Sequence, residues 1–198
     1  MTAFRCVFIR HGKTPGNKQK LYVGRTDESL LPEERIRLKN GPRPEVSRIF
    51  VSPMKRCMET AEILFPGREK EIVPSWREMD FGIAEYRSYE EMKSFDWYRK
   101  FFEDEKIGFP EGESKEDFTK RVLDGLDCLK GNTEDVALVI HGGVIMSLLH
   151  ALTGRERSLY DWMPKNGKGW QGTVCYEEKT GFSIRDVRPF PDEKEDVT

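Results

Sequence analysis

Short runs of apolar residues alternate along the chain with longer stretches in which apolar residues recur every three or four positions. Such runs predict strands, and they lie at 3–10, 47–52, 71–74, 135–140, 173–177 and 182–187. The runs at 3–10 and 135–140 are almost wholly apolar, which is typical of strands buried on both faces. The last two runs are separated by a turn at 179–181 and predict a hairpin.

Helical spacing of apolar residues follows three of these strands. The first helix is expected to begin at Pro53, with Ser52 as its cap, and to continue to about Phe65. The other two are expected between Ser114 and Gly131 and between His141 and Gly154. A weaker pattern allows a short helix within 32–44, whereas 11–31 is expected to be a loop. This alternation predicts an α/β fold, a mostly parallel sheet flanked by helices on both faces.

Two segments differ from this pattern. Residues 79–113 mix aromatic and charged side chains, and Ser88 with Glu91 forms a capping-box pattern. We expect one or two helices there, lying over a site as a helical insertion within a single domain of residues 1–198. Residues 188–198 are charged and acidic, and we expect a frayed tail.

Composition narrows the classes of function. The 198 residues carry 33 basic and 35 acidic side chains, a net charge of −2, which argues against a general nucleic-acid binder. No apolar run approaches the roughly 18 residues of a membrane helix, and the first residues have no signal-peptide pattern. The four cysteines are widely spaced and are expected to be reduced thiols in a cytoplasmic protein. Neither membrane nor nucleic-acid partners are expected, and the pattern does not predict an oligomeric state.

Three predicted strands end in residues with distinctive chemistry. Arg10 and His11 follow the first strand, Ser52 and Arg56 follow the second, and His141 follows the strand at 135–140. Ligands of α/β sheets bind beyond the carboxyl ends of the strands, so we expect these side chains to meet at one edge.

Two histidines and two arginines at one site suit the chemistry of phosphate. Arginine grips phosphate oxygens in a bidentate way, and a neutral histidine held in one tautomer is a competent nucleophile. Gly12 allows a tight turn beside the phosphate. His141, before two glycines and a helix start, can donate to a phosphoryl oxygen and adds to the positive field of the helix N-terminus.

The motifs around these residues resemble those of the histidine phosphatase superfamily, which is also called phosphoglycerate mutase-like. Residues 10–17 (RHGKTPGN) are similar to the family's RHGxTxxN signature. Further matches follow in family order at 24–27 (GRTD), 52–61 (SPMKRCMETA), 77–82 (REMDFG), 110–114 (PEGES) and 139–143 (VIHGG). In its compact 79–140 segment and its 110–114 block the chain resembles alpha-ribazole and broad-specificity phosphatases.

The resemblance implies a role for each matching residue. His11 would be the phosphorylated nucleophile, with Arg10, Arg56 and His141 completing the phosphate pocket, and Glu78 would donate a proton to the leaving alcohol. The substrate-binding positions that it implies are Thr14, Asn17, Gly24, Arg25 and Gly142. It also implies a small phosphomonoester substrate and neither a metal nor an organic cofactor. Asp80 and Glu85 are nearby carboxylates that remain alternatives for the acid, and Arg25 is equally compatible with a surface charge.

The chain departs from the family pattern after residue 82, where Ile83–Tyr86 (IAEY) replace the usual Trp-Glu-Gly. The glycine of the usual Leu-Thr-x-x-Gly segment is also missing near residue 34. Both changes alter the walls of the site, and neither touches a catalytic match. His150 is expected to be a helix residue without a catalytic role.

Alternatives to a phosphatase remain. A zinc site would need three or four ligands in a suitable array, which three histidines spaced in this way do not supply. A noncatalytic interaction module on the same fold is a second alternative, although such relatives usually lose the nucleophile or an arginine. A phosphoglycerate mutase-type phosphotransferase is the third. Only 62 residues separate Glu78 from His141, which leaves little chain for the lid that a mutase needs.

Overall fold

The computed structural model describes residues 1–192 and contains one six-stranded sheet with the strand order β3-β2-β4-β1-β5-β6. The strands are β1 (Thr2–Arg10), β2 (Arg48–Val51), β3 (Glu71–Ile72), β4 (Val136–Ile140), β5 (Gly169–Glu177) and β6 (Gly181–Phe190). The first four are mutually parallel, and β5 and β6 are antiparallel to their neighbours. The predicted mostly parallel α/β sheet is therefore confirmed.

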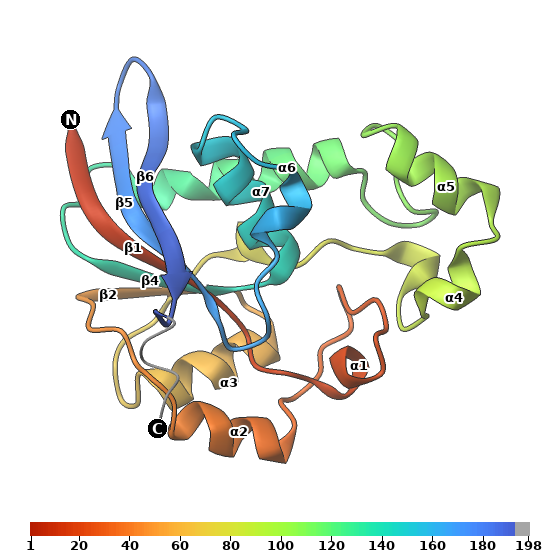
Figure 1. Cartoon of the computed structure of the whole chain (residues 1–198), viewed down its shortest axis with the longest axis horizontal. Helices are drawn as coiled ribbons and strands as arrows, with labels where there is room; N and C mark the ends of the chain where they lie inside the picture. The colour runs from red at the N-terminus through yellow and green to blue at the C-terminus, as the bar shows by residue number, and fades with distance from the viewer. Residues whose placement is uncertain (193–198) are drawn as a thin grey trace.

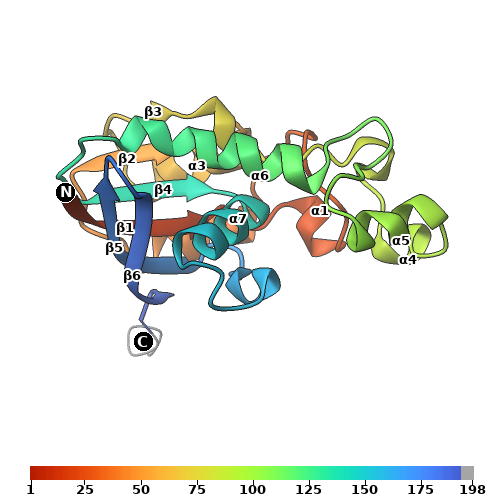
Figure 2. The ribbon, with the colours of Figure 1, turned by 90° about the horizontal axis from the view of Figure 1, so that it is seen from above.

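Helices cover both faces of the sheet (Figure 1). On one face lie α2 (Pro32–Lys39) and α3 (Lys55–Leu64), and on the other lie α6 (Lys115–Asp124) and α7 (Gly142–Leu152). The shorter helices α1 (Pro15–Lys18), α4 (Tyr89–Met92) and α5 (Asp96–Glu103) extend away from the carboxyl ends of β1 and β4 (Figure 2). The first residues of α6 reach toward α5 in both views. Within the described residues, no helix is both long and apolar enough to span a bilayer.

Alternation along the central strands explains why both faces are covered. In β1, Cys6 and Phe8 pack into the cluster under α6 and α7, whereas Val7 and Ile9 pack into the cluster under α2 and α3. All five residues of β4 are fully buried. Because successive side chains of a strand point to opposite faces, an almost wholly apolar strand needs a helical layer on each side.

The predicted helix caps are mostly confirmed. Ser114 accepts a hydrogen bond from the Asp117 amide at the start of α6, and Ser88 with Glu91 forms a capping box at α4. The expected cap at Ser52 is wrong, because α3 begins at Lys55 with Met54 as its N-cap. The Ser52 hydroxyl contacts His141 instead. The segment at 11–31, expected to be a loop, contains the short helix α1.

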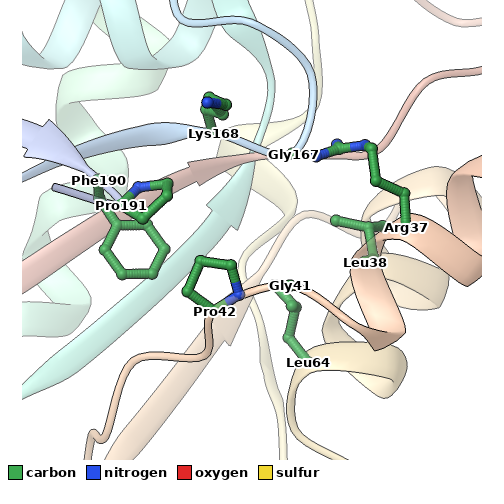
Figure 3. A pocket seen from close by; sticks show the side chains of 9 residues that line it. All are labelled: Arg37, Leu38, Gly41, Pro42, Leu64, Gly167, Lys168, Phe190 and Pro191. Atoms are coloured by element: carbon green, nitrogen blue, oxygen red, sulfur yellow. The ribbon is translucent and has the colours of Figure 1, made fainter. Parts of the chain in front are cut away.

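The expected acidic tail begins later than 188. Residues 188–190 continue β6, and Phe190 is buried beside Leu38 and Leu64. A hollow of about 20 Å³ remains there, lined also by Pro191 (Figure 3). The apolar character of Phe190 explains its place in the core. Residues 193–198 lie outside the described part of the chain.

The close approach of β1 and β5 depends on Gly169. A Cβ atom at this position would overlap the carbonyl oxygen of Phe8 on the neighbouring strand. We expect Gly169→Ala to lower the free energy of unfolding by more than about 2 kcal/mol, because the strands would have to separate. Urea denaturation measures the change. Gly41→Ala is the matched control, since the nearest atoms to its Cβ would be carbonyl oxygens 3.3 and 3.6 Å away. Equal stabilities of the two variants would contradict the prediction.

Candidate active site

Parallel pairing of β1 with β4 brings the two histidine motifs together. The His11 amide donates a hydrogen bond to the carbonyl of Ile140, the residue before His141, at 2.9 Å. The imidazole rings lie 5.2 Å apart between centroids, nearly edge to face. The expected convergence at the carboxyl edge is therefore present in the structure, where β1 and β4 end side by side.

His11 is held as a neutral imidazole with a defined tautomer. Its Nδ1 lies 2.7 Å from the carbonyl oxygen of Gly12, which can only accept a hydrogen bond. Burial lowers the pKa of His11 well below its usual value, and the guanidinium groups of Arg56 and Arg10 lower it further. Nδ1 therefore carries the proton, and the lone pair is left on Nε2. A neutral ring with a free nitrogen is the form that can attack an electrophile.

Arg10 has a guanidinium group that the protein satisfies only in part. Its Nη1 donates to the Pro164 carbonyl at 2.9 Å and lies 3.5 Å from the sulfur of Met163. Its Nε is buried and has no hydrogen-bond partner among the described residues. A buried donor without a partner is costly and is rare in folded proteins. This N–H is thus available to an anion, and Arg10 lines the cavity that is also lined by His11 and Glu78.

Arg56 is fully buried and faces the loop that follows α1. It donates to the carbonyls of Gly24 and Thr26, each at 2.8 Å, and to that of Val23 at 3.3 Å. Its Nε lies 3.3 Å from Nδ1 of His141. Arg56 therefore ties the loop to the histidine, and the cavity wall does not include it.

His141 is also fully buried behind the cavity wall. Burial lowers its pKa well below the usual value, with a further contribution from Arg56, so the ring is neutral. Its Nε2 lies 2.7 Å from the Ser52 hydroxyl, while Nδ1 accepts from Arg56. Since a hydroxyl can either donate or accept, Ser52 is compatible with both neutral tautomers of His141.

Glu78 lies on the cavity wall near these groups. Its carboxylate accepts hydrogen bonds from the amides of Met79 at 3.0 Å and Gly143 at 3.1 Å. Desolvation raises the pKa of Glu78 above its usual value, although both amides and the two arginines oppose the shift. A Cβ atom at Gly143 would overlap the carboxylate, so glycine is needed there. Glu78 is thereby fixed beside the N-terminus of α7, with a raised affinity for a proton.

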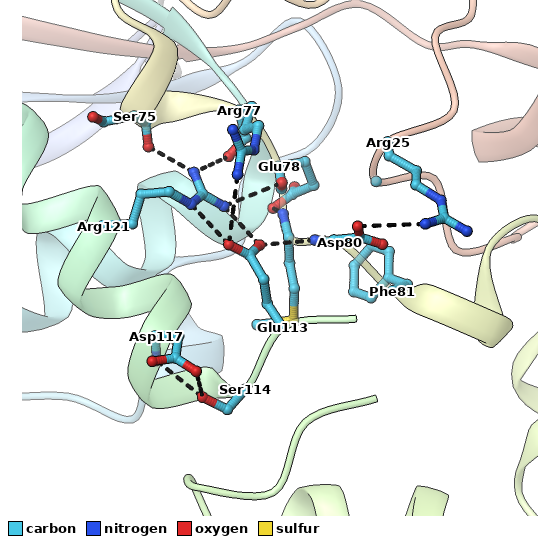
Figure 4. Close-up of polar contacts among 12 residues, drawn as sticks. Arg25, Ser75, Arg77, Glu78, Asp80, Phe81, Glu113, Ser114, Asp117 and Arg121 are labelled. Atoms are coloured by element: carbon cyan, nitrogen blue, oxygen red, sulfur yellow. Dashed lines mark hydrogen bonds and ion pairs between the residues drawn. The ribbon is translucent and has the colours of Figure 1, made fainter. Parts of the chain in front are cut away.

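The chain around Glu78 is held by a partly buried ion pair between Arg121 and Glu113 (Figure 4). Arg121 donates to the Ser75 carbonyl at 2.8 Å and reaches the Glu78 carbonyl at 3.4 Å. Glu113 accepts from the Asp80 amide at 2.9 Å. These two residues therefore fix the backbone on both sides of Glu78. Glu113 belongs to the 110–114 motif, but no pattern in the sequence predicts that it pairs with Arg121.

The predicted substrate-binding residues are distributed unevenly. Asn17 and Gly142 line the cavity, and Asn17 accepts from Asn166 at 3.0 Å. Thr14 is fully buried and caps α1. Gly24 and Arg25 do not line the cavity, and Arg25 is exposed, with its guanidinium 3.6 Å from Asp80 (Figure 4).

Sequence reasoning missed the role of Glu85. Its carboxylate accepts from the amides of Gly24 and Arg25, each at 2.9 Å, and from the Thr26 hydroxyl at 2.6 Å. Glu85 thus organises the loop that Arg56 contacts, and it lies in the stretch where the chain departs from the family pattern. The loop at 163–166, which meets Arg10 and Asn17, was also missed because it carries no motif beyond a turn-like Pro164.

The cavity beside these groups has a volume of about 280 Å³. One part of its wall is polar and contains Arg10, His11, Asn17 and Glu78. The remainder is largely apolar and is supplied mainly by Tyr22, Phe81, Phe101, Phe102, Phe109, Phe118, Met146 and Leu159. Phe81, Phe101, Phe102 and Phe109 belong to the 79–113 segment. Among the described residues, no group of three or more His, Cys, Asp and Glu side chains is arranged to hold a metal ion.

A sequence profile of the histidine phosphatase superfamily (branch 1) matches residues 6–182 of this chain. The chain belongs to the histidine phosphatase superfamily. The match spans both histidine motifs, Glu78 and Arg56, in agreement with the resemblance drawn from the motifs.

Individual relatives in this superfamily are distant. The chain is 33% identical over 142 residues to "Probable fructose-2,6-bisphosphatase TIGAR A" of Danio rerio, across 65% of this chain and 54% of the relative. It is 27% identical to "Broad-specificity phosphatase YOR283W" of Saccharomyces cerevisiae, across 75% and 70%. The chain thus spans about half of the Danio rerio relative, and it spans 34% of another relative from Arabidopsis thaliana.

The fold is shared with solved structures. The alpha-ribazole phosphatase of Shigella flexneri superposes with a TM-score of 0.76 over 92% of this chain and 95% of that chain, at 23% identity. This confirms the phosphoglycerate mutase-like fold expected from the sequence.

The Arg121–Glu113 pair should stabilise the fold in a pH-dependent way. Desolvation alone would raise the pKa of Glu113, but hydrogen bonds from Arg121 and the Asp80 amide lower it. Its stabilising effect is therefore present above the unfolded-state pKa and is lost as the pH falls through the lowered folded-state pKa.

We expect Arg121→Met to cost about 2 kcal/mol of unfolding free energy at pH 7 and less at pH 3, because the pair is mostly buried. Denaturant titrations at both pH values measure this. Arg99→Met is the control, since the Arg99–Asp96 pair is exposed and should cost less than about 0.5 kcal/mol. A loss independent of pH would refute the role given to Glu113.

Proposed function

We propose that this protein is a phosphomonoester hydrolase that acts on a small phosphorylated metabolite through a phosphohistidine at His11. The observation that carries the proposal is the buried Nε of Arg10, which has no hydrogen-bond partner within residues 1–192, beside the neutral ring of His11. A nucleophilic nitrogen next to a cationic donor fits a phosphoryl group, because the donor can bind its oxygens while the nitrogen attacks phosphorus.

The phosphate would be bound by several positive groups. Arg10 supplies a guanidinium group, and Gly142 and Gly143 lie at the N-terminus of α7, where backbone amides favour an anion. Arg56 adds positive charge from behind the cavity wall. His141 would donate to a phosphoryl oxygen from Nδ1 in its other neutral tautomer, in which the Ser52 hydroxyl donates to Nε2 and Nδ1 no longer accepts from Arg56.

The reaction would take place in two steps. Nε2 of His11 attacks phosphorus, the bond from phosphorus to the ester oxygen breaks, and Glu78 gives its proton to the leaving oxygen. Water then attacks the phosphohistidine, Glu78 takes a proton from that water, and the P–N bond breaks to release phosphate. The raised pKa of Glu78 suits it to the first step, because the acid must be protonated when the alcohol leaves.

The proposal includes neither a metal ion nor an organic cofactor. Arg10, Arg56 and the N-terminus of α7 together offer the positive charge that a divalent ion would otherwise supply to the equatorial oxygens. Activity should therefore persist after chelation. The net charge of −2 favours a small-molecule substrate over a nucleic acid.

Hydrolysis is favoured over a mutase reaction by the chemistry of the cavity wall. A mutase must retain its hydrophilic dephosphorylated product while the phosphohistidine persists. The 79–113 segment covers part of the cavity, but the side chains that it contributes there are four phenylalanines and Met79, which offer such a product no strong hydrogen bonds. A mutase-type phosphotransferase remains the second candidate, because it would use the same His11 and Glu78 chemistry. A noncatalytic module is disfavoured, since the nucleophile and both arginines are all present.

The decisive experiment combines phosphate release with trapping of the phosphoenzyme. Wild-type protein should release phosphate from simple monoesters and form an acid-labile, alkali-stable phosphoenzyme. His11→Ala should abolish the adduct and lower turnover by about three orders of magnitude or more. His150→Ala is the matched control, because the His150 ring lies near the far end of α7, where it contacts the Arg157 carbonyl. Near-normal turnover of His11→Ala would refute the mechanism, and fast turnover of 3-phosphoglycerate primed with bisphosphate, without phosphate release, would establish the mutase instead.

Glu78 is tested by varying the leaving group. We expect Glu78→Gln to lower kcat/KM for alkyl phosphates at least about 100-fold more than for aryl phosphates, whose leaving groups need little protonation. The measurement compares an alkyl phosphate with 4-nitrophenyl phosphate in both proteins. Equal losses would move the acid role elsewhere, and Asp80→Asn and Glu85→Gln then test the two neighbouring carboxylates.

A further inference from the structure

The apolar part of the cavity contains more aromatic surface than a phosphate site requires. Phe101 and Phe109 stack with their ring centroids 4.1 Å apart, and Phe81 meets Phe109 edge to face at 5.5 Å. Tyr22 joins Phe81 at 5.0 Å. Rings that pack on one another in this way form a rigid wall, and this wall continues into the cavity that contains His11.

Phe102 shows that these rings are not simply a core. It lines the cavity and yet remains 45% exposed, while its neighbour Phe101 is 5% exposed. Tyr160, which is distant from Phe102 in the sequence, also lines this cavity and is 54% exposed. Large apolar side chains exposed around a cavity are typical of a surface that a ligand covers.

Lys115 adds a cation to this aromatic wall. It is the first residue of α6, and its Nζ lies 4.8 Å from the ring centroid of Phe101 and 5.0 Å from that of Phe102. Among the described residues no hydrogen-bond or ion-pair partner is found for its ammonium group, and Glu105 acts on it only through a weaker charge interaction. Burial lowers the pKa of Lys115, which indicates that its charge is not fully compensated.

Taken with the proposed function, on which this inference rests, the cavity divides into three zones. The polar zone around His11 would hold the phosphate, the phenylalanine wall would hold an apolar body, and Lys115 would meet a charge at its margin. A volume of about 280 Å³ accommodates a body of one or two rings, at the lower end of the range of ligand pockets.

We propose that the substrate is a phosphomonoester whose alcohol part is an apolar ring that bears a second, anionic group, with the ring packed on Phe101, Phe102 and Phe109 and the anion paired with Lys115. A polyhydroxylated sugar phosphate bound on this wall would leave those hydroxyl groups that face the phenyl rings without hydrogen bonds. An apolar ring would pack against the phenyl rings, and an anionic group at its far end would pair with the ammonium group of Lys115.

The test uses alkyl phosphates with similar leaving groups, so that chemistry at phosphorus stays constant. The probes are ethyl phosphate, 2-phenylethyl phosphate and 2-(4-carboxyphenyl)ethyl phosphate. We expect kcat/KM to rise at least about tenfold from ethyl phosphate to 2-phenylethyl phosphate. It should rise a further threefold to fivefold, roughly, from 2-phenylethyl phosphate to the carboxylated compound.

Paired variants assign each gain to its residues. Phe102→Ala should lower the ratio of kcat/KM for phenylethyl phosphate to kcat/KM for ethyl phosphate. Phe95→Ala is the matched control, because Phe95 is similarly exposed and lies outside the cavity lining. Lys115→Met should abolish only the gain from the carboxylate. Lys120→Met is its control, since Lys120 is an exposed lysine of α6 that does not line the cavity.

The outcomes separate this inference from the proposed function. Equal kcat/KM values for ethyl and phenylethyl phosphate, with phosphate release from both, would overturn the substrate class and leave the phosphatase standing. A carboxylate gain that survives in Lys115→Met would overturn the pairing with the distal anion. Failure of all three probes and of phosphoenzyme trapping would overturn the proposed function itself.

Discussion

The packing of two guanidinium groups, Arg56 fully buried and Arg10 half-buried, beside two neutral imidazoles is the constraint on which the rest of the site depends. Arg10 and Arg56 lower the pKa of His11, and burial acts in the same direction. Such a concentration of positive charge is costly in the absence of an anion. Arg56 offsets the cost by donating to three backbone carbonyls, whereas Arg10 keeps one buried donor without a partner among residues 1–192. The positive groups of the site are therefore arranged in advance for an anionic ligand.

Around this charge, carboxylates act mainly as positioning groups. Glu85 accepts hydrogen bonds from backbone amides of 24–26, and Glu78 accepts hydrogen bonds from two backbone amides. Glu113 together with Arg121 fixes the backbone on both sides of Glu78. The contacts of Glu85 with 24–26 and of Glu78 with the Gly143 amide join segments far apart in the sequence, so the loops at the carboxyl edge of the sheet are bound to one another as well as to the strands. This arrangement can hold reacting groups in place without a metal ion as template.

The second characteristic of the site is the contrast between its two walls. The phosphate side is built from the ends of β1 and β4 and from the start of α7, which directly follows β4. The other side is built from the 79–113 segment and the first turn of α6, which lie beyond the sheet (Figure 2). Chemistry and selectivity are thus assigned to different parts of the chain, and the aromatic wall can vary without disturbing the strand pairing that brings His11 to His141.

The sequence by itself determined the sheet, the order of its helices and the edge at which the histidines meet. These follow from local patterns, because apolar alternation specifies which faces are buried and parallel strands end at a common edge. Only the tertiary structure decided that Ser52 contacts His141 rather than capping α3, that Thr14 caps α1 rather than lining the cavity, and that Arg25 lies apart from it. The same holds for Glu85, for the pairing of Glu113 with Arg121 and for Lys115 against two phenyl rings. The physical reason is that a polar side chain can form hydrogen bonds with several different partners. Which partner lies close enough is set by the packing of segments that are distant in the sequence.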